Sequence, residues 1–260
     1  MKSPTERFAK LALGRTPLGL WPMRVRSGVA AGARWTLYPW TSYWRGAHEP
    51  LMQQALISLG DGDIRGWSCW DLGAHFGLYS VGLARRTGPT GQVAAFEPNP
   101  ASFARLQRHG RMNNLSWLKC YAAAVSDHAD GAELYTYGDL GTTTTHLPYH
   151  GESRPSGQDG AVAIATLRLD DLVARGELRP PQFVKIDVEG HGGPALNGMR
   201  ETLAAHRPIV IAAFHSPEEI EGMMALLRPL GYTWRQIAEH PEAGEPRVGA
   251  DYLFSPAKRG

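Results

Sequence analysis

The chain has 260 residues, a formal net charge of +2 and two cysteines, and 43% of its residues are hydrophobic. This composition is typical of a globular protein, and the balanced charge gives no indication of binding to nucleic acid or to an anionic membrane. No apolar run approaches the ~18 residues of a membrane span, and the N-terminus lacks the apolar segment of a signal peptide. We therefore expect a cytoplasmic protein in which Cys69 and Cys120 are buried free thiols, with a disulfide as the alternative.

The first 60 residues predict a small extension. Residues 23–40 predict two short strands around a Gly/Ala turn, which we expect to form a hairpin. Residues 48–60 predict a helix with Pro50 in its first turn and Gly60 at its end. The aromatic run at 35–50 suits a platform for a sugar, a satellite core or a dimer contact. We expect residues 1–60 to act as a cap or dimer contact for a main domain at 61–260.

From residue 67 onward, predicted strands and helices alternate. Strands are expected at 67–73, 92–98, 118–127, 182–190 and 208–215, and helices at 76–88, 99–114, 170–176, 193–206 and 216–231. Asn99, Asp170 and Ser216 have the chemistry of helix N-caps. This alternation predicts an α/β fold with a parallel sheet covered on both faces. The last two strands, 232–239 and 250–256, have no helix between them and predict an antiparallel hairpin at the sheet edge.

The turn after the first of these strands has features of a nucleotide-binding site. Asp71 ends the strand, and Gly73 and Gly77 allow a sharp turn that leaves N–H groups free at the helix start. Glu97 ends the next strand, where a carboxylate can accept both hydroxyls of a ribose. His75 replaces the middle glycine of G-x-G-x-x-G and would crowd a pyrophosphate. The pattern favours S-adenosylmethionine, with a plain tight turn and an exposed strand-end acid as the alternatives.

Several motifs occur in a characteristic order and spacing. They are WDLGAHFGLYS at 70–80, FEPNP at 96–100, AAAVSD at 122–127, LDDL at 169–172, FVKIDVEG at 183–190 and RPIVIAAFH at 207–215. Over about residues 49–215 the chain resembles the FkbM-type S-adenosylmethionine-dependent methyltransferases. The resemblance implies a class I, Rossmann-like methyltransferase fold with a seven-stranded, mostly parallel sheet. It also implies O-methylation of a hydroxyl on a sugar, glycan or secondary metabolite.

The same resemblance implies a set of cofactor-binding residues. They are Glu49, Asp71, Gly73, Ala74, Gly77, Glu97, Pro98, Asn99, Ala124 and Asp187. Asp71, Gly73 and Gly77 would surround the methionine part, Glu97 would hold the ribose, and Ala124 would lie near the adenine.

The chain departs from the family pattern at two places. His191 and Gly192 stand where the family usually has Ala and Glu, and Ala213 stands where it usually has an acid. Two carboxylates are therefore expected to be missing from the substrate side. This disfavours a metal site and indicates an altered acceptor pocket.

Transfer of a methyl group to an alcohol needs a base beside the acceptor oxygen. Asp187 and Glu189 should lie on one side of an extended chain, and His215, which ends the next strand, has a suitable intrinsic pKa. We expect His215 to be the base, with Asp187 as the alternative and His191 and His146 as further candidates. Asp187 could instead pair with Lys185 or cap a helix, and His215 could be a satisfied polar residue.

No metal ligand is predicted, although Mg²⁺ on Asp187, Glu189 and His215 is a minority interpretation. Residues 138–160 lack a clear hydrophobic periodicity, and we expect them to form a mobile lid that becomes ordered when the acceptor binds.

The leading function is O-methylation of a small-molecule or saccharide acceptor. The alternatives are a catalytically impaired cofactor-binding module, an RNA methyltransferase and a nicotinamide oxidoreductase, and a homodimer is compatible with the extension.

Overall fold

A mostly parallel sheet of seven strands lies at the centre of the computed structural model, which describes residues 22–37, 42–136, 145–146 and 160–257. The strand order is β12-β13-β11-β10-β3-β4-β5, and the strands from β11 to β5 are parallel. Their bounds are Ser68–Leu72 (β3), Gln92–Phe96 (β4), Leu118–Tyr121 (β5), Phe183–Ile186 (β10), Ile209–Ala213 (β11), Tyr232–Gln236 (β12) and Asp251–Pro256 (β13). Because β13 runs antiparallel to β11 and β12, the predicted closing hairpin is confirmed, as is the α/β fold.

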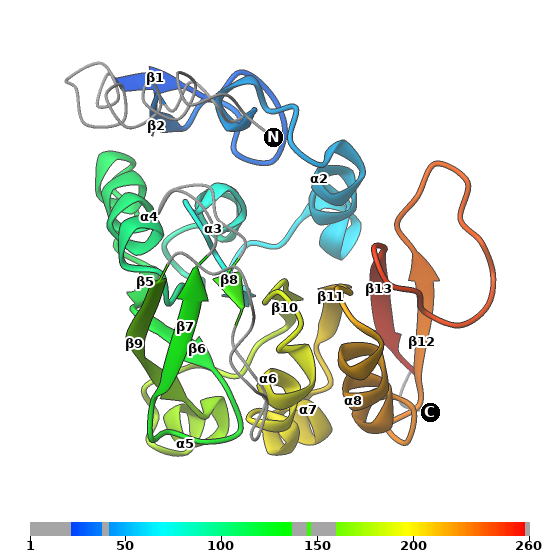
Figure 1. Ribbon diagram of the computed structural model, residues 1–260. Helices are drawn as coiled ribbons and strands as arrows, with labels where there is room; N and C mark the ends of the chain where they lie inside the picture. The colour runs from blue at the N-terminus through cyan, green and yellow to red at the C-terminus, as the bar shows by residue number, and fades with distance from the viewer. Residues whose placement is uncertain (1–21, 38–41, 137–144, 147–159, 258–260) are drawn as a thin grey trace, which may run out of the picture.

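Helices cover both faces of this sheet (Figure 1). Their bounds are Pro50–Ile57 (α2), Leu78–Thr87 (α3), Pro100–Met112 (α4), Leu169–Ala174 (α5), Gly192–Asn197 (α6), Arg200–His206 (α7) and Pro217–Leu227 (α8). Side chains of one strand alternate between the faces. Cys69 packs in a buried cluster with α2, α3 and α4, whereas Trp70 packs in a second cluster with α5 to α8. Burial on both faces explains why the strands are almost entirely apolar.

A second, four-stranded sheet lies beside the main one, in the order β6-β9-β7-β8. Its strands are Ala123–Val125 (β6), Ala132–Thr136 (β7), Thr145–His146 (β8) and Gly160–Leu167 (β9). The single strand predicted at 118–127 is wrong, because its first half pairs with β4 and its second half pairs with β9. Most of the lid predicted at 138–160 lies outside the described residues, so its mobility stays a prediction.

The predicted helix caps are confirmed in two of three cases. The Asn99 side chain accepts the N–H groups of Ala101 and Ser102 in α4, and Ser216 accepts the N–H of Glu219 in α8. The Asp170 carboxylate caps α7 instead of its own helix, since it accepts the N–H groups of Glu201 and Thr202 at 2.9 Å each. The helix predicted at 193–206 is in fact two helices, α6 and α7.

The N-terminal extension packs onto the main domain. The predicted hairpin is present as β1 (Pro22–Arg24) and β2 (Arg34–Thr36), followed by a 3₁₀ turn, Tyr43–Arg45, and α2. These elements lie at the end of the main sheet toward which β10 and β11 point (Figure 1). Trp35 belongs to the same buried cluster as α3, and Tyr43 and Trp44 pack against this cluster, so part of the aromatic run joins the main core and not a separate satellite core. The domain boundary at residue 60 and the dimer contact stay predictions.

His109 fixes the extension to α4. Its ring stacks on Trp35 with 3.6 Å between the ring centroids, and both residues are 1% exposed. Nδ1 lies 2.7 Å from the Phe76 carbonyl oxygen, so it must donate, and Nε2 accepts the Thr36 N–H at 3.2 Å. The Nε2 contact needs the neutral ring, because a protonated Nε2 cannot accept a hydrogen bond, and burial lowers the pKa of His109 to about 4 although the bond to Phe76 opposes this shift.

Protonation of His109 should therefore destabilise the fold. The folded-state pKa of about 4 lies below the reference value of 6.5, so the unfolded chain binds the proton first as the pH falls. The stabilisation is complete above the reference pKa and is lost progressively below it, by up to ~3 kcal/mol. Urea unfolding measured at about pH 7.5 and about pH 5 should show this loss in the wild type and a smaller loss in His109→Gln.

The surface variant His206→Gln is the matched control and should keep the wild-type pH dependence. If the free energy of unfolding falls equally in the wild type and in His109→Gln between these two pH values, protonation of His109 is not the cause of the loss.

Candidate functional site

A cavity of about 370 Å³ opens at the carboxyl ends of the parallel strands, a size within the usual range for ligand pockets. It is lined by carboxylates, histidines and a tyrosine, with small and apolar residues between them. The polar side chains come from Tyr43, His48, Glu49, His75, Glu97, Asn99, Ser102, Asp187, Glu189, His191 and His215. The site lies at the strand edge where open α/β sheets bind their ligands.

Most of the residues predicted for the site line this cavity. They are Glu49, Gly73, Glu97, Pro98, Asn99, Ala124 and Asp187 from the cofactor set, and Glu189, His191 and His215 from the catalytic set. Asp71, Ala74 and Gly77 are described but do not line it. His146 belongs to β8, where its backbone pairs with that of Tyr135, and its side chain is outside the described part of the structure.

The glycine turn serves packing more than ligand binding. Gly73 has a φ of +79°, and a Cβ there would lie 1.8 Å from the Asp187 carbonyl oxygen. Gly77 has a φ of +85°, and its Cβ would lie 2.5 Å from Leu106 of α4. Both positions therefore need glycine for close contact between segments of the chain.

The N–H groups of residues 73–75, which precede α3, are bound within the protein, whereas free N–H groups at the start of α3 stay a prediction. The N–H groups of Gly73 and Ala74 both donate to the Phe96 carbonyl, and the N–H of His75 donates to Glu97. Anion-binding turns depend on N–H groups that point at the ligand. A phosphate therefore finds few donors here.

The Glu97 carboxylate is held in place by two hydrogen bonds and can still accept others. One carboxylate oxygen accepts the His75 N–H at 2.7 Å and the other accepts the Asn99 N–H at 2.8 Å. Burial raises the pKa of Glu97 to about 7, although these two bonds oppose the shift. Each carboxylate oxygen can accept a further hydrogen bond. The group therefore has the geometry to receive two neighbouring hydroxyls.

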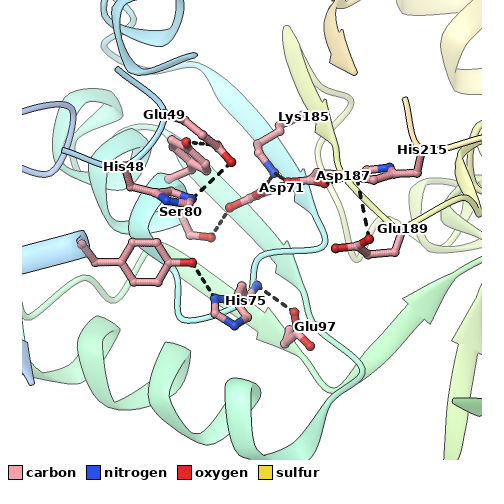
Figure 2. Close-up of polar contacts among 12 residues, drawn as sticks. His48, Glu49, Asp71, His75, Ser80, Glu97, Lys185, Asp187, Glu189 and His215 are labelled. Atoms are coloured by element: carbon pink, nitrogen blue, oxygen red, sulfur yellow. Dashed lines mark hydrogen bonds and ion pairs between the residues drawn. The ribbon is translucent and has the colours of Figure 1, made fainter. Parts of the chain in front are cut away.

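A buried lysine, Lys185, lies between two carboxylates of the site (Figure 2). Lys185 and Asp71 are register partners on β10 and β3, and Lys185 Nζ lies 3.8 Å from Asp71 Oδ1 and 3.1 Å from Asp187 Oδ2. Burial disfavours the ammonium, but the carboxylates of Asp187, Asp71 and Glu49 raise the pKa of Lys185 above its ordinary value. Asp71 also accepts the Ser80 hydroxyl at 2.5 Å. Asp71 thus supports the site from below, and the predicted alternative of an Asp187–Lys185 pair is confirmed.

The extension supplies one wall of the cavity, in which Glu49 was predicted and Tyr43 and His48 were not. The Tyr43 hydroxyl lies 2.9 Å from His75 Nδ1, and the Tyr79 hydroxyl donates to Glu49. Burial raises the pKa of Glu49, but its contacts with His48 and Tyr79 lower it more, to about 2. Burial also lowers the pKa of His75 to about 4. At neutral pH this wall therefore holds an ionised Glu49 beside a neutral His75.

The carboxylates expected to be missing have counterparts from later elements. Glu219 of α8 accepts the Gly192 N–H at 2.9 Å, and a Cβ on Gly192 would lie 2.6 Å from the same oxygen. Asp251 of β13 is the register partner of Ala213. Neither Glu219 nor Asp251 lines the cavity, so the expected alteration of the acceptor pocket stays a prediction.

The segment after β10 turns sharply. Glu189 has a φ of +51°, so Asp187 and Glu189 do not share one side of an extended chain as predicted. The turn nevertheless brings both carboxylates to one imidazole, because His215 Nε2 lies 3.4 Å from Asp187 Oδ1 and 3.8 Å from Glu189 Oε2. Figure 2 shows the three side chains pointing toward one another.

His215 carries a positive charge at neutral pH. Its side chain is 31% exposed, and its Nδ1 lies 3.3 Å from Glu219 Oε2. Burial opposes protonation, but Glu219, Asp187 and Glu189 together raise the pKa of His215 to about 9. The second histidine near this position, His191, is 3% exposed, and its Nε2 lies 3.1 Å from the Ser126 hydroxyl oxygen.

Other sequence-based expectations concern metals, thiols and membranes. Within the described ranges, no three His, Cys, Asp or Glu side chains are grouped so as to hold a metal ion. Cys69 and Cys120 are free thiols, as predicted, with Cys69 buried and Cys120 partly buried. Among the helices that the structure describes, each is too short or too polar to cross a bilayer.

Known proteins with similar sequences are methyltransferases. The hexuronic acid methyltransferase AglP of Haloferax volcanii is 27% identical over 212 residues, which cover 77% of each chain. The 2-O-methyltransferase NoeI of Sinorhizobium fredii is 26% identical over 174 residues, which cover 62% of this chain and 69% of that protein. A solved FkbM methyltransferase from Methylobacillus flagellatus aligns with a TM-score of 0.48 and 17% identity, over 76% of this chain and 47% of that one.

The Methyltransferase FkbM domain model matches residues 71–233, which is more than half of the chain. The match includes the strand-end residues Glu97, Asp187 and His215. The chain therefore belongs to the FkbM methyltransferase family and is an S-adenosylmethionine-dependent methyltransferase.

Proposed function

We propose that the protein methylates a hydroxyl group of a sugar, a glycan or a related secondary metabolite. The observation that carries this proposal is that one cavity is lined both by an acceptor for two hydroxyl groups and by a group that can take up a proton. Glu97 offers two acceptor oxygens on one side, and His215 with Asp187 offers a proton acceptor on the other. The names of two relatives, a hexuronic acid methyltransferase and a 2-O-methyltransferase, support the sugar class.

The residues present fit S-adenosylmethionine. Glu97 would accept the ribose hydroxyls, and Gly73, Asn99 and Ala124 would line the space beside it. Glu49, Asp187 and other carboxylates give the described cavity wall a negative character that favours a sulfonium cation. The same carboxylates disfavour a pyrophosphate or an RNA backbone. When bound, the cofactor supplies an electrophilic methyl carbon and retains the electron pair of the broken carbon–sulfur bond.

His215 is the proposed proton acceptor. Its Nε2 lies on the side of the ring that carries Asp187 and Glu189, at the cavity wall. The ring must first lose its own proton, which its raised pKa of about 9 makes unfavourable at neutral pH. The neutral ring is then a strong base for the hydroxyl proton. Asp187, the alternative base, is engaged by Lys185 at 3.1 Å.

Replacement of Glu97 should weaken cofactor binding. Glu97→Ala should cost ~1.5–3 kcal/mol in affinity for S-adenosylhomocysteine, because charge-assisted hydrogen bonds are lost. Wild-type affinity should rise with pH through the Glu97 pKa of about 7, as the carboxylate ionises. Calorimetric titration measures both effects. Glu221→Ala, on the exposed face of α8, is the control, and equal affinities for wild type and Glu97→Ala would remove Glu97 from the site.

Replacement of His215 should separate binding from chemistry. His215→Ala should lose ~10²-fold or more in turnover with an accepted sugar, while S-adenosylhomocysteine binds almost normally. In the wild type, kcat/KM should rise as pH increases up to about 9, the pKa of His215. If kcat/KM instead rises only at acidic pH, and Asp187→Asn loses more turnover than His215→Ala, Asp187 is the base.

A further inference from the structure

Glu219 is outside the cavity wall, yet it contacts the groups that shape it. Its side chain is 0% exposed, and it lies in the first turn of α8. One carboxylate oxygen accepts the Gly192 N–H at 2.9 Å, and the other accepts the His215 N–H at 2.8 Å. Its own N–H donates to Ser216 Oγ at 3.1 Å. Both oxygens of the Glu219 carboxylate therefore accept a backbone hydrogen bond, and these bonds fix its position.

The position of this carboxylate decides which ring nitrogen of His215 carries a proton. Glu219 Oε2 lies 3.3 Å from Nδ1, and an ionised carboxylate can only accept a hydrogen bond. A hydrogen bond between these two groups requires a proton on Nδ1, and Nε2 would then be the nitrogen that gains and loses a proton. Nε2 is the nitrogen that lies near Asp187 and Glu189.

We propose that Glu219 is a positioning residue that holds His215 in the Nδ1–H tautomer and presents Nε2 to the acceptor hydroxyl. This inference rests on the proposed function, since it assigns the support for the proposed base. The hydroxyl proton moves to Nε2, and the imidazolium that forms keeps Glu219 as its counter-ion. A buried carboxylate behind a catalytic imidazole acts in the same way in the Ser-His-Asp triad.

Four carboxylates influence the charge of His215, and Glu219 differs from the others by its burial. Asp187 and Glu189 come from the loop after β10, Asp251 comes from β13, and Glu219 comes from α8. The side chains of Asp187 and Glu189 are 28% and 38% exposed, so water screens their charges. Glu219 is fully buried, and its charge should act on the ring with the least screening.

The test compares Glu219→Gln with Glu218→Gln, an exposed neighbour in the same helical turn. NMR of ¹⁵N- and ¹³C-labelled histidine in the S-adenosylhomocysteine complex reports the pKa and tautomer of His215, assigned with His215→Ala. In Glu219→Gln, the pKa of His215 should fall by ~1–3 units and the Nδ1–H tautomer should lose its dominance. Turnover should fall ~10²-fold with S-adenosylhomocysteine affinity within about twofold of wild type. Glu218→Gln should match the wild type.

Glu219→Asp keeps the charge and should retain more of the Nδ1–H tautomer than Glu219→Gln does. It also serves as the second variant if the amide impairs folding. An unchanged tautomer and pKa of His215 in Glu219→Gln would overturn the proposal, and so would a Glu219→Asp variant that departs from the wild type as far as Glu219→Gln does. A changed tautomer with normal turnover would also overturn it, because the base would then not depend on Glu219. Failure of the wild type to methylate any sugar would count against the proposed function, whereas the NMR titration decides the role of Glu219 without turnover.

Discussion

The candidate site depends on a cation buried in its floor. Lys185 is 1% exposed and lies between the carboxylates of Asp71 and Asp187, so it joins β3, β10 and the loop that follows β10. Removal of one partner from a buried ion pair costs ~3–5 kcal/mol, because an uncompensated charge remains. The ammonium also interacts favourably with Glu49 and Asp187, two carboxylates of the cavity wall, and partly neutralises their charges.

Burial and neighbouring charges give the titratable side chains of the cavity different protonation states at neutral pH. His75 is neutral because burial lowers its pKa to about 4, while His215 is charged because carboxylates raise its pKa to about 9. Glu97 titrates near neutral pH, with its pKa at about 7. The arrangement pairs a fixed acceptor for hydroxyl groups with a separate group that can exchange a proton. These are the two tasks that an alcohol methyltransferase needs.

Elements from the two ends of the chain complete a site built on the central strands. The extension contributes Tyr43 and Glu49 to the cavity wall, whereas the C-terminal part places Glu219 and Asp251 outside the wall, against Gly192 and Ala213. Positions 192 and 213, where the sequence lacks acids, therefore face carboxylates from α8 and β13. This compensation would keep the surroundings of His215 acidic, although the acids come from new positions in the chain.

The sequence by itself determined the alternation of strands and helices, the closing hairpin, and the strand-end positions of Glu97, Asp187 and His215. These features follow from local periodicity and from the rule that parallel strands end at one sheet edge. The tertiary structure alone decided that Asp71 supports the floor and that Glu219 lies behind His215. A sequence pattern records neighbours along the chain, whereas these contacts depend on strand register and on the packing of α8 against the loop after β10.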